Sequence, residues 1–445
     1  MKILRILLVV IIALVVLLII GVGVGFNSGF QTWIARRAVA GQADLKAEIG
    51  RVSVGLNRIE LTSIRIVRPG MILELPSATV EVPVLKAAGK NVAVRRLLAH
   101  GWTLDLTAPD KLAGQSPVGR RGLAGYIAVL SSADAAPAAK SEAFDGIFGE
   151  LKLPVALSVD GVDLAGEIIF PAEGGKPARA KVTLAGGQLA SGREGRFTLQ
   201  AEAALSGAVS VLDCKGELGV HMDTPSSIDR VTFSNQATAK GTSVPNGAAM
   251  QMDLKAERRS DGAEVYSLGI QSQGKSLVSV TAALPSRGAK LDGKLVLEAR
   301  DSDLAPFALG HPVPEFDAKA EADFGVSTSF NQFMAKGRLD IAISRLEVLQ
   351  KELSPVGPLR IRAEYSFENT GGLLRVSSLR ANVEGDAPVV GIEARQSFEY
   401  EMPQRELHVA DAGKELIAVR LEAIPLAWAQ PFLDKVSLTG GEAKG

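Results

Sequence analysis

An eight-residue stretch with phosphate-binding spacing is the clearest candidate for chemistry in this sequence. Residues 269–276 read GIQSQGKS and fit the pattern G-x-x-x-x-G-K-[ST]. In nucleotide-binding proteins such a loop directs backbone N–H groups at phosphates, its lysine neutralises phosphate charge and its hydroxyl group reaches Mg²⁺. The loop must also begin a helix, because the helix N-terminus then points at the phosphates. The flanking residues therefore decide whether this stretch binds a nucleotide.

Those flanking residues favour a β-hairpin. The upstream run EVYSLG and the downstream run SLVSVTAALP both have strand composition, and Pro285 ends the second. A phosphate loop also needs an aspartate at the end of a later apolar strand to hold Mg²⁺. No such strand follows here in a strand-helix-strand arrangement. The sequence thus predicts a turn at Gln271–Gly274 with Lys275 in solvent, and a nucleotide binder at Gly269–Ser276 stays as a remote alternative.

Other residue types that carry chemistry are scattered. The four histidines lack metal-binding spacing, Ser116 lacks a nucleophile elbow, and Cys214 has no second cysteine with which to form a disulfide. Forty-nine basic residues balance 49 acidic residues, which disfavours a nucleic-acid partner. We therefore expect no catalytic residue, no metal ligand and no cofactor, and a protein that is not an enzyme.

The N-terminal residues predict a membrane anchor. Residues Ile6–Phe26 form 21 uncharged positions, which is enough for a helix to cross a bilayer. Ala38-Val39-Ala40 resembles a cleavage site, but Arg36 and Arg37 intervene, so we favour an uncleaved anchor with a cytoplasmic N-terminus. Phe30 and Trp33 suit the membrane interface. The anchor comprises Ile6, Leu7, Leu8, Val9, Val10, Ile11, Ile12, Leu14, Val15, Val16, Leu17, Leu18, Ile19 and Ile20.

The remaining chain alternates apolar and polar residues, which predicts mainly β structure with about twenty mostly antiparallel strands. Clear examples lie at residues 78–84, 151–159, 197–205 and 359–367. We expect hairpin turns at five glycine-containing pairs. These pairs are Asp160-Gly161, Gly186-Gly187, Asp261-Gly262, Asp292-Gly293 and Gly371-Gly372.

Helical spacing is confined to residues 123–130 and 144–151. Two short helices cannot cover twenty strands, so the sheet must bury its own apolar face by forming a sandwich, a closed sheet or a long curled trough. The alternating pattern is compatible with all three architectures.

A weak repeat relates residues 303–325 to 424–445, since each carries a Pro-Phe pair in a short helical knot before a strand. We divide the chain into an anchor with a juxtamembrane helix, a first β module, a helical insertion and two further β modules, the last of them short or truncated. Their ranges are 1–46, 47–118, 119–152, 153–310 and 311–445.

Several stretches resemble the AsmA superfamily of bacterial inner-membrane-anchored periplasmic proteins, including its TamB-like members. After the anchor come FQTWIARRAVAGQADLKAEIGRVSVGLNRIELTSIRIVRPGMILELPSATVEVPV at residues 30–84 and VRRLLAHGWTLDL at 94–106. The strand at 153–171 and the Pro-Phe knots are also similar. The resemblance implies a β-groove in the periplasm that carries phospholipid from the inner towards the outer membrane and supports outer-membrane assembly. It also implies outer-membrane or periplasmic protein partners.

Two hypotheses follow. In the first, inward aliphatic side chains line a groove for phospholipid acyl chains. These residues are Val80, Val82, Leu153, Val155, Leu157, Leu199 and Ile361. In the second, the same side chains fill an ordinary core, and the protein is a structural or adaptor component of the cell envelope with a protein-binding edge strand.

Overall fold

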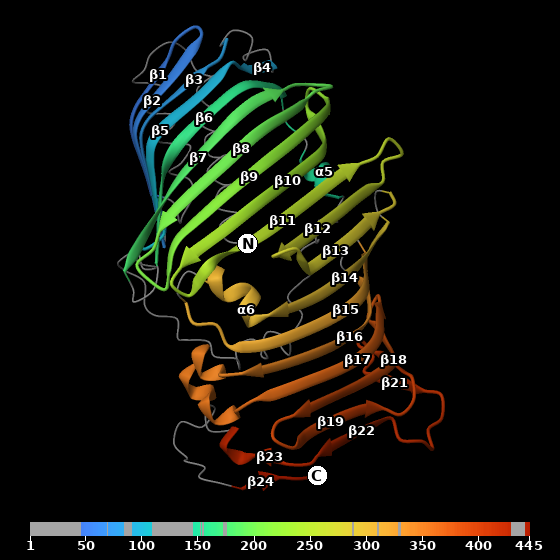
Figure 1. Cartoon of the computed structure of the whole chain (residues 1–445). Coiled ribbons are helices and arrows are strands. Elements are labelled where there is room, and N and C mark those ends of the chain that lie inside the picture. The colour runs from blue at the N-terminus through green and yellow to red at the C-terminus, as the bar shows by residue number, and fades with distance from the viewer. Residues whose placement is uncertain are drawn as a thin grey trace.

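The computed structural model describes residues 46–68, 70–83, 91–108, 146–151, 153, 155–171, 176–286, 289–308, 311–327, 331–428 and 441–445. Within these ranges the chain is mainly β, as the sequence predicts. One long sheet contains 22 strands, and a second contains the two short strands near the C-terminus. Figure 1 shows the strands of the large sheet following one another in a long, twisted array from β1 to β22.

The strands vary in length from two to sixteen residues. In the first half they are β1 (Lys46–Val54), β2 (Arg58–Arg68), β3 (Met71–Glu81), β4 (Asn91–Val94), β5 (Arg96–Asp105), β6 (Ala156–Pro171), β7 (Pro177–Leu189), β8 (Glu194–Ala204), β9 (Val209–Thr224), β10 (Ser227–Gly241), β11 (Val244–Arg258) and β12 (Glu264–Ser272). In the second half they are β13 (Lys275–Leu284), β14 (Lys290–Arg300), β15 (Glu315–Ser327), β16 (Gln332–Ser344), β17 (Leu359–Thr370), β18 (Leu373–Glu384), β19 (Pro388–Ala394), β20 (Phe398–Glu401), β21 (Glu406–Val409), β22 (Ile417–Leu421), β23 (Ile424–Pro425) and β24 (Glu442–Ala443).

Nearly all pairings in the large sheet are antiparallel, as predicted. From β6 to β19 each strand pairs with the next in the chain, and β22 then pairs with β19. The exceptions are β4 and β5, which both lie parallel to β6. A parallel pair needs a long crossover connection, and here about fifty residues separate β5 from β6 in the sequence.

The helical elements are short and connect strands. They are α5 (Ile147–Glu150), α6 (Asp301–Leu304), η2 (Ala305–Phe307), η3 (Leu346–Val348) and η4 (Lys351–Val356). The second predicted helical patch is confirmed by α5, and the knot at Pro306-Phe307 by α6 and η2. The patch at 123–130 and the second knot at Pro431-Phe432 lie outside the described residues.

Three of the five expected turn pairs are wrong. Asp261-Gly262 and Gly371-Gly372 do form hairpin turns, whereas Asp160-Gly161, Gly186-Gly187 and Asp292-Gly293 lie inside β6, β7 and β14. The glycines there allow close packing. A Cβ on Gly187 would lie 2.0 Å from the Asp160 carbonyl oxygen, and one on Gly293 would lie 2.3 Å from the Phe324 ring.

The strand predicted at residues 151–159 begins later than expected. Leu153 and Val155 lie outside β6, which starts at Ala156. Leu153 N–H instead donates to the Ser226 carbonyl oxygen at 2.9 Å, in the turn between β9 and β10. Local alternation cannot show this contact with a distant turn.

The expected anchor at Ile6–Ile20 and the aromatic residues Phe30 and Trp33 lie outside the described residues. Within the part of the chain that the structure describes, no helix is long and apolar enough to cross a bilayer.

Candidate functional site

One face of the large sheet carries a continuous row of apolar side chains. Residues that are register partners on successive strands point to the same face. Starting at Val52 on β1, this partner relation can be followed through 19 strands to Val419 on β22. The row is Val52, Leu61, Ala78, Ala99, Leu164, Leu184, Leu199, Gly216, Asn235, Met252, Ile270, Val278, Leu297, Ala320, Leu339, Ala363, Ala381, Ile392 and Val419.

We call the side of the sheet on which this row lies the apolar face. Asn235 is the only member of the row with a polar side chain, and the Cys214 Sγ donates to its Oδ1 at 2.9 Å. Burial raises the pKa of the Cys214 thiol, and the hydrogen bond to Asn235 offsets this in part. The thiol is therefore protonated at neutral pH and behaves as a small apolar group with one donor.

The apolar row is long. Neighbouring strands lie about 4.8 Å apart, so the 18 steps from β1 to β22 span roughly 85 Å along the sheet. That is about twice the full thickness of a bilayer with its headgroups. Small apolar ligands would therefore cover the whole row only if several of them lay end to end.

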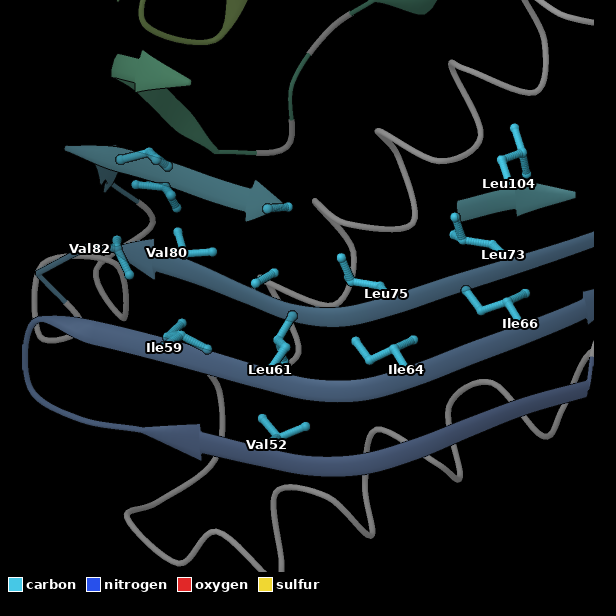
Figure 2. Packing of buried hydrophobic residues seen from close by; sticks show 14 of the residues in the cluster. Val52, Ile59, Leu61, Ile64, Ile66, Leu73, Leu75, Val80, Val82 and Leu104 are labelled. Carbon is cyan, nitrogen blue, oxygen red and sulfur yellow. The ribbon is translucent and has the colours of Figure 1, made fainter. Parts of the chain in front are cut away.

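The first part of the apolar face is well buried. Side chains of β1–β5, with Val82 directly after β3, form a single cluster that includes Ile59, Leu61 and Val80. Figure 2 shows these side chains pointing to the same side of the strands. Val82 is fully buried and Ile59 is 1% exposed, so this region is packed like an ordinary protein core.

From β15 onward the same face is mostly half-exposed, as the row residues on β6–β14 other than Gly216 already are. The apolar-face residues of β15–β19 are still aliphatic or aromatic, but nearly all of them are half-exposed, including Phe316, Leu339, Ile361, Leu379 and Ile392. At the last strand, Ile417 is 40% and Val419 54% exposed. Within these strands only Ala318, Val376 and Asn369 on this face are buried.

An aromatic group lies in the open region. The Phe333 and Phe367 rings meet edge to face with centroids 6.0 Å apart, and Tyr365 stacks on Phe367 at 5.5 Å. Phe333 is itself exposed. Sequence reasoning did not select these three residues, although Tyr365 and Phe367 share the alternation that selected Ile361.

The opposite side, which we call the charged face, carries ladders of ion pairs. Cross-strand pairs include Lys319–Glu298 at 3.5 Å, Arg338–Glu321 at 3.1 Å, Arg360–Asp340 at 2.7 Å, Arg362–Glu384 at 3.0 Å and Arg380–Glu393 at 2.8 Å. A hydrogen bond from Arg360 lowers the pKa of Asp340, and one from Arg380 lowers the pKa of Glu393. This face is hydrated, and it leaves the apolar face as the side for an apolar ligand.

The predicted lining residues divide between the two regions. Val80 and Val82 are buried, and Val155 and Leu157 pack against their cluster. Leu153 packs against a second cluster around Phe197 and Met222. Leu199 and Ile361 are half-buried on the apolar face, but eight strands lie between them, so the seven residues do not form one local pocket.

The phosphate-loop motif is a hairpin turn. Ser272 ends β12, Lys275 begins β13, and Gln273 and Gly274 between them have φ angles of 50° and 81°. The hairpin turn is therefore confirmed, but it is shorter than the predicted Gln271–Gly274, because Gln271 and Ser272 still belong to β12. The Lys275 side chain is half-exposed and pairs with two carboxylates, because its Nζ lies 3.5 Å from Glu298 and 4.0 Å from Asp303. A strand follows the turn where a phosphate loop requires a helix.

One group of residues has the composition of a metal site. Among the residues described, Glu401, Glu406 and His408 bring their ligand atoms within 4.8 Å of one another at the β20–β21 hairpin. Glu406 and His408 are exposed, and Glu401 is half-exposed. Carboxylate and imidazole groups suit a divalent cation, but this hairpin shows no further feature that indicates a ligand.

Comparison with protein-family models, with curated proteins and with solved structures finds no match to this chain.

Proposed function

We propose that this protein is an inner-membrane-anchored periplasmic lipid-binding protein, which holds phospholipid acyl chains along its apolar face and conducts them between the inner and outer membranes. The observation that supports this most directly is the half-exposed apolar face of β15–β22. A contiguous apolar surface beyond a few hundred Å² is rare on a monomer and usually marks a binding site. Each Å² covered by an apolar ligand contributes about 25 cal/mol of favourable free energy.

The chemistry of the face favours acyl chains. Leu339, Ala363, Ala381 and Ile392 form consecutive positions of the row and offer no side-chain hydrogen bond. A polypeptide lying on this surface would leave its backbone N–H and C=O groups without partners, at a cost for each one. An acyl chain has no such groups, and it needs only continuous apolar contact.

The anchor is a prediction from the sequence, and transport between the two membranes is what the family resemblance implies. Ile6–Phe26 would hold the β body at the inner membrane, and the resemblance to the AsmA superfamily suggests a role in outer-membrane assembly. The face would then be a passive path, without a catalytic step or cofactor. A row of roughly 85 Å accommodates several lipids in succession.

The test is to analyse the lipid that co-purifies with the full chain, using native mass spectrometry. Ile361→Glu places a charge on the apolar face and should reduce bound phospholipid several-fold, because burying an unpaired carboxylate against acyl chains is costly. Ser366→Glu is the matched control, because it adds the same charge to the same strand on the opposite face. Equal lipid content in both variants would contradict the proposal.

A second measurement locates the lipid. A photoreactive residue in place of Leu339 should crosslink to phospholipid, and one in place of Leu157 should do so if the path continues into the first part of the face. The same group in place of Asp340, which is half-exposed on the charged face, should not. Protein that is always empty and never crosslinks would favour the alternative, an envelope adaptor whose β22 edge binds a protein. The exposed Ile417 and Val419 are the observation that favours this alternative.

A further inference from the structure

A short segment lies over the apolar face at one end of β9, β10 and β12. We call its described residues, 146–151, 153 and 155–157, the strap. Its second half is tied to the turn between β9 and β10, because Leu153 N–H donates to Ser226 at 2.9 Å and Leu157 N–H donates to Pro225 at 2.7 Å. Leu153 also packs with apolar-face residues of β8–β10. The strap therefore lies over one end of these strands.

The first half of the strap docks on β12. The Phe148 side chain is fully buried, and its backbone N–H donates to Glu264 Oε2 at 3.5 Å. The Ile147 N–H donates to the Tyr266 hydroxyl oxygen at 3.4 Å, and that hydroxyl donates to Glu264. Glu264 and Tyr266 lie on the apolar face, as their pairing with Leu284 and Ala282 shows.

Glu264 is an unusual residue for this position. Glu264 is 4% exposed and is the only buried acidic residue on the part of this face that the structure describes. Arg258 is its register partner on β11, but the Arg258 guanidinium contacts Asp223 at 3.0 Å and Ser227 at 2.8 Å. A buried carboxyl group is costly without donors. The Tyr266 hydroxyl and the Phe148 N–H supply donors, so the strap and Glu264 satisfy each other.

Gly146 permits this contact. Its φ angle is 89°, and a Cβ at this position would lie 2.4 Å from the Glu264 Oε1 atom. Any larger residue would push the strap away from β12. The contact is closely fitted, yet it is small. The helix α5 has four residues and no side-chain cap, and its first residue, Ile147, is exposed.

The other end of β10 has its own cover. Phe307 of η2 packs there against a cluster that includes Val209, Ala239 and Ala248. The strap lies against β10 near Ser227, and Phe307 lies near Ala239, so the two covers occupy opposite ends of the same strand. The row crosses β10 between them, at Asn235.

We propose that the strap is a releasable gate on the lipid path, with Phe148 occupying a position on the apolar face that an acyl chain takes when the strap leaves β12. This gate rests on the proposed lipid-binding function. Docked, the strap covers the apolar face at the Ser227 end of β10 and the Glu264 end of β12. Released, it uncovers an apolar site whose polar rim, Glu264 and Tyr266, faces the strand end.

The gate is tested with Gly146→Ala in the full chain. The added Cβ should displace the strap, so amide hydrogen exchange of residues 147–151 should rise roughly tenfold or more. Uptake of a fluorescent phospholipid from vesicles of phosphatidylethanolamine and phosphatidylglycerol should become faster. Gly262→Ala is the matched control. Gly262 has a similar φ of 85° in the nearby turn before β12, but a Cβ there meets no atom within 4 Å.

Tyr266→Phe is an independent second variant, because it removes the hydroxyl group and leaves the ring. It should also increase exchange at Ile147 and Phe148. Unchanged exchange in both variants would show that the strap is not held by this contact. Faster exchange with an unchanged rate of lipid uptake would show that the strap is released but is not a gate. If no variant and no wild-type protein takes up lipid, the proposed function itself fails, while the exchange data still report on the contact.

Discussion

Gly166 illustrates how the space left by a neighbouring side chain limits which residue fits at a position on the apolar face. The Trp102 indole lies directly over it, so that a Cβ on Gly166 would be 2.2 Å from a ring carbon and 2.3 Å from the Trp102 carbonyl oxygen. Both atoms belong to groups that cannot move easily, because Trp102 packs in the buried first part of the face. The pair is set by the parallel contact between β5 and β6, in which Trp102 and Gly166 are register partners.

We predict that Gly166→Ala lowers the free energy of unfolding by about 1–3 kcal/mol, the range typical of overpacking a core. Gly269→Ala should change it by less than about 0.5 kcal/mol. Gly269 also lies within a strand, β12, but a Cβ there would meet no atom within 4 Å. Urea denaturation of the two variants provides the measurement. Equal losses would show that the Trp102 contact does not limit the residue at 166.

Among the elements, β14–β19 depend on ionised carboxylates on the charged face. The pKa values of Glu298, Asp340 and Glu393 are all lowered, the first chiefly by the charge of Lys319 and the others by hydrogen bonds from Arg360 and Arg380. A carboxyl group with a lowered pKa in the folded state stabilises the protein above its unfolded pKa. This stabilisation is lost as the pH falls through the pKa that the carboxyl group has in the folded state.

We therefore predict that these strands lose stability as the pH falls below about 4, the ordinary pKa of such carboxyl groups. Asp340→Asn should reduce the difference in stability between pH 7 and pH 3, because one of the titrating groups is gone. The effect should also weaken in 1 M salt, which screens exposed pairs. Amide hydrogen exchange of β16 and β17 at the two pH values measures it. A variant with the same pH dependence as the wild type would contradict the ladder model.

The alternation of apolar and polar residues predicted the strands well where one face of the sheet is apolar and the other is charged. Residues 359–367 form β17 with Ile361 and Phe367 on the apolar face, as expected. The pair Gly186-Gly187 misled the prediction, because its purpose is close approach to Arg196 and Asp160, on strands that the local sequence does not identify. The contact of Glu264 with α5 was missed for the same reason. Pairing across more than one hundred residues leaves no local pattern.

At the scale of the whole molecule, one continuous row of apolar residues passes through two environments. Ile59 in the first part is 1% exposed, whereas Ile361 in the second part is half-exposed. Both are isoleucines near the start of long strands on the same face. The difference between them therefore reports on how each region is covered, and sequence alternation cannot distinguish them because it identifies the face but not the cover.

We predict that Ile59→Ala costs about 2–5 kcal/mol of local stability with or without lipid, since it leaves a cavity in a packed core. Ile361→Ala should cost less than about 1.5 kcal/mol in lipid-free protein, because solvent already reaches its side chain.

Bound phospholipid should increase the protection of β15–β18 against amide hydrogen exchange by about 2.7 kcal/mol at a hundredfold excess over Kd. Ile361→Ala should reduce this gain, because part of the contact surface is removed. Hydrogen exchange measured along the chain, with and without phospholipid, separates these effects. Lipid that protects β2 and β3 as strongly as β15–β18, or protects neither, would contradict an open path in the second part of the sheet.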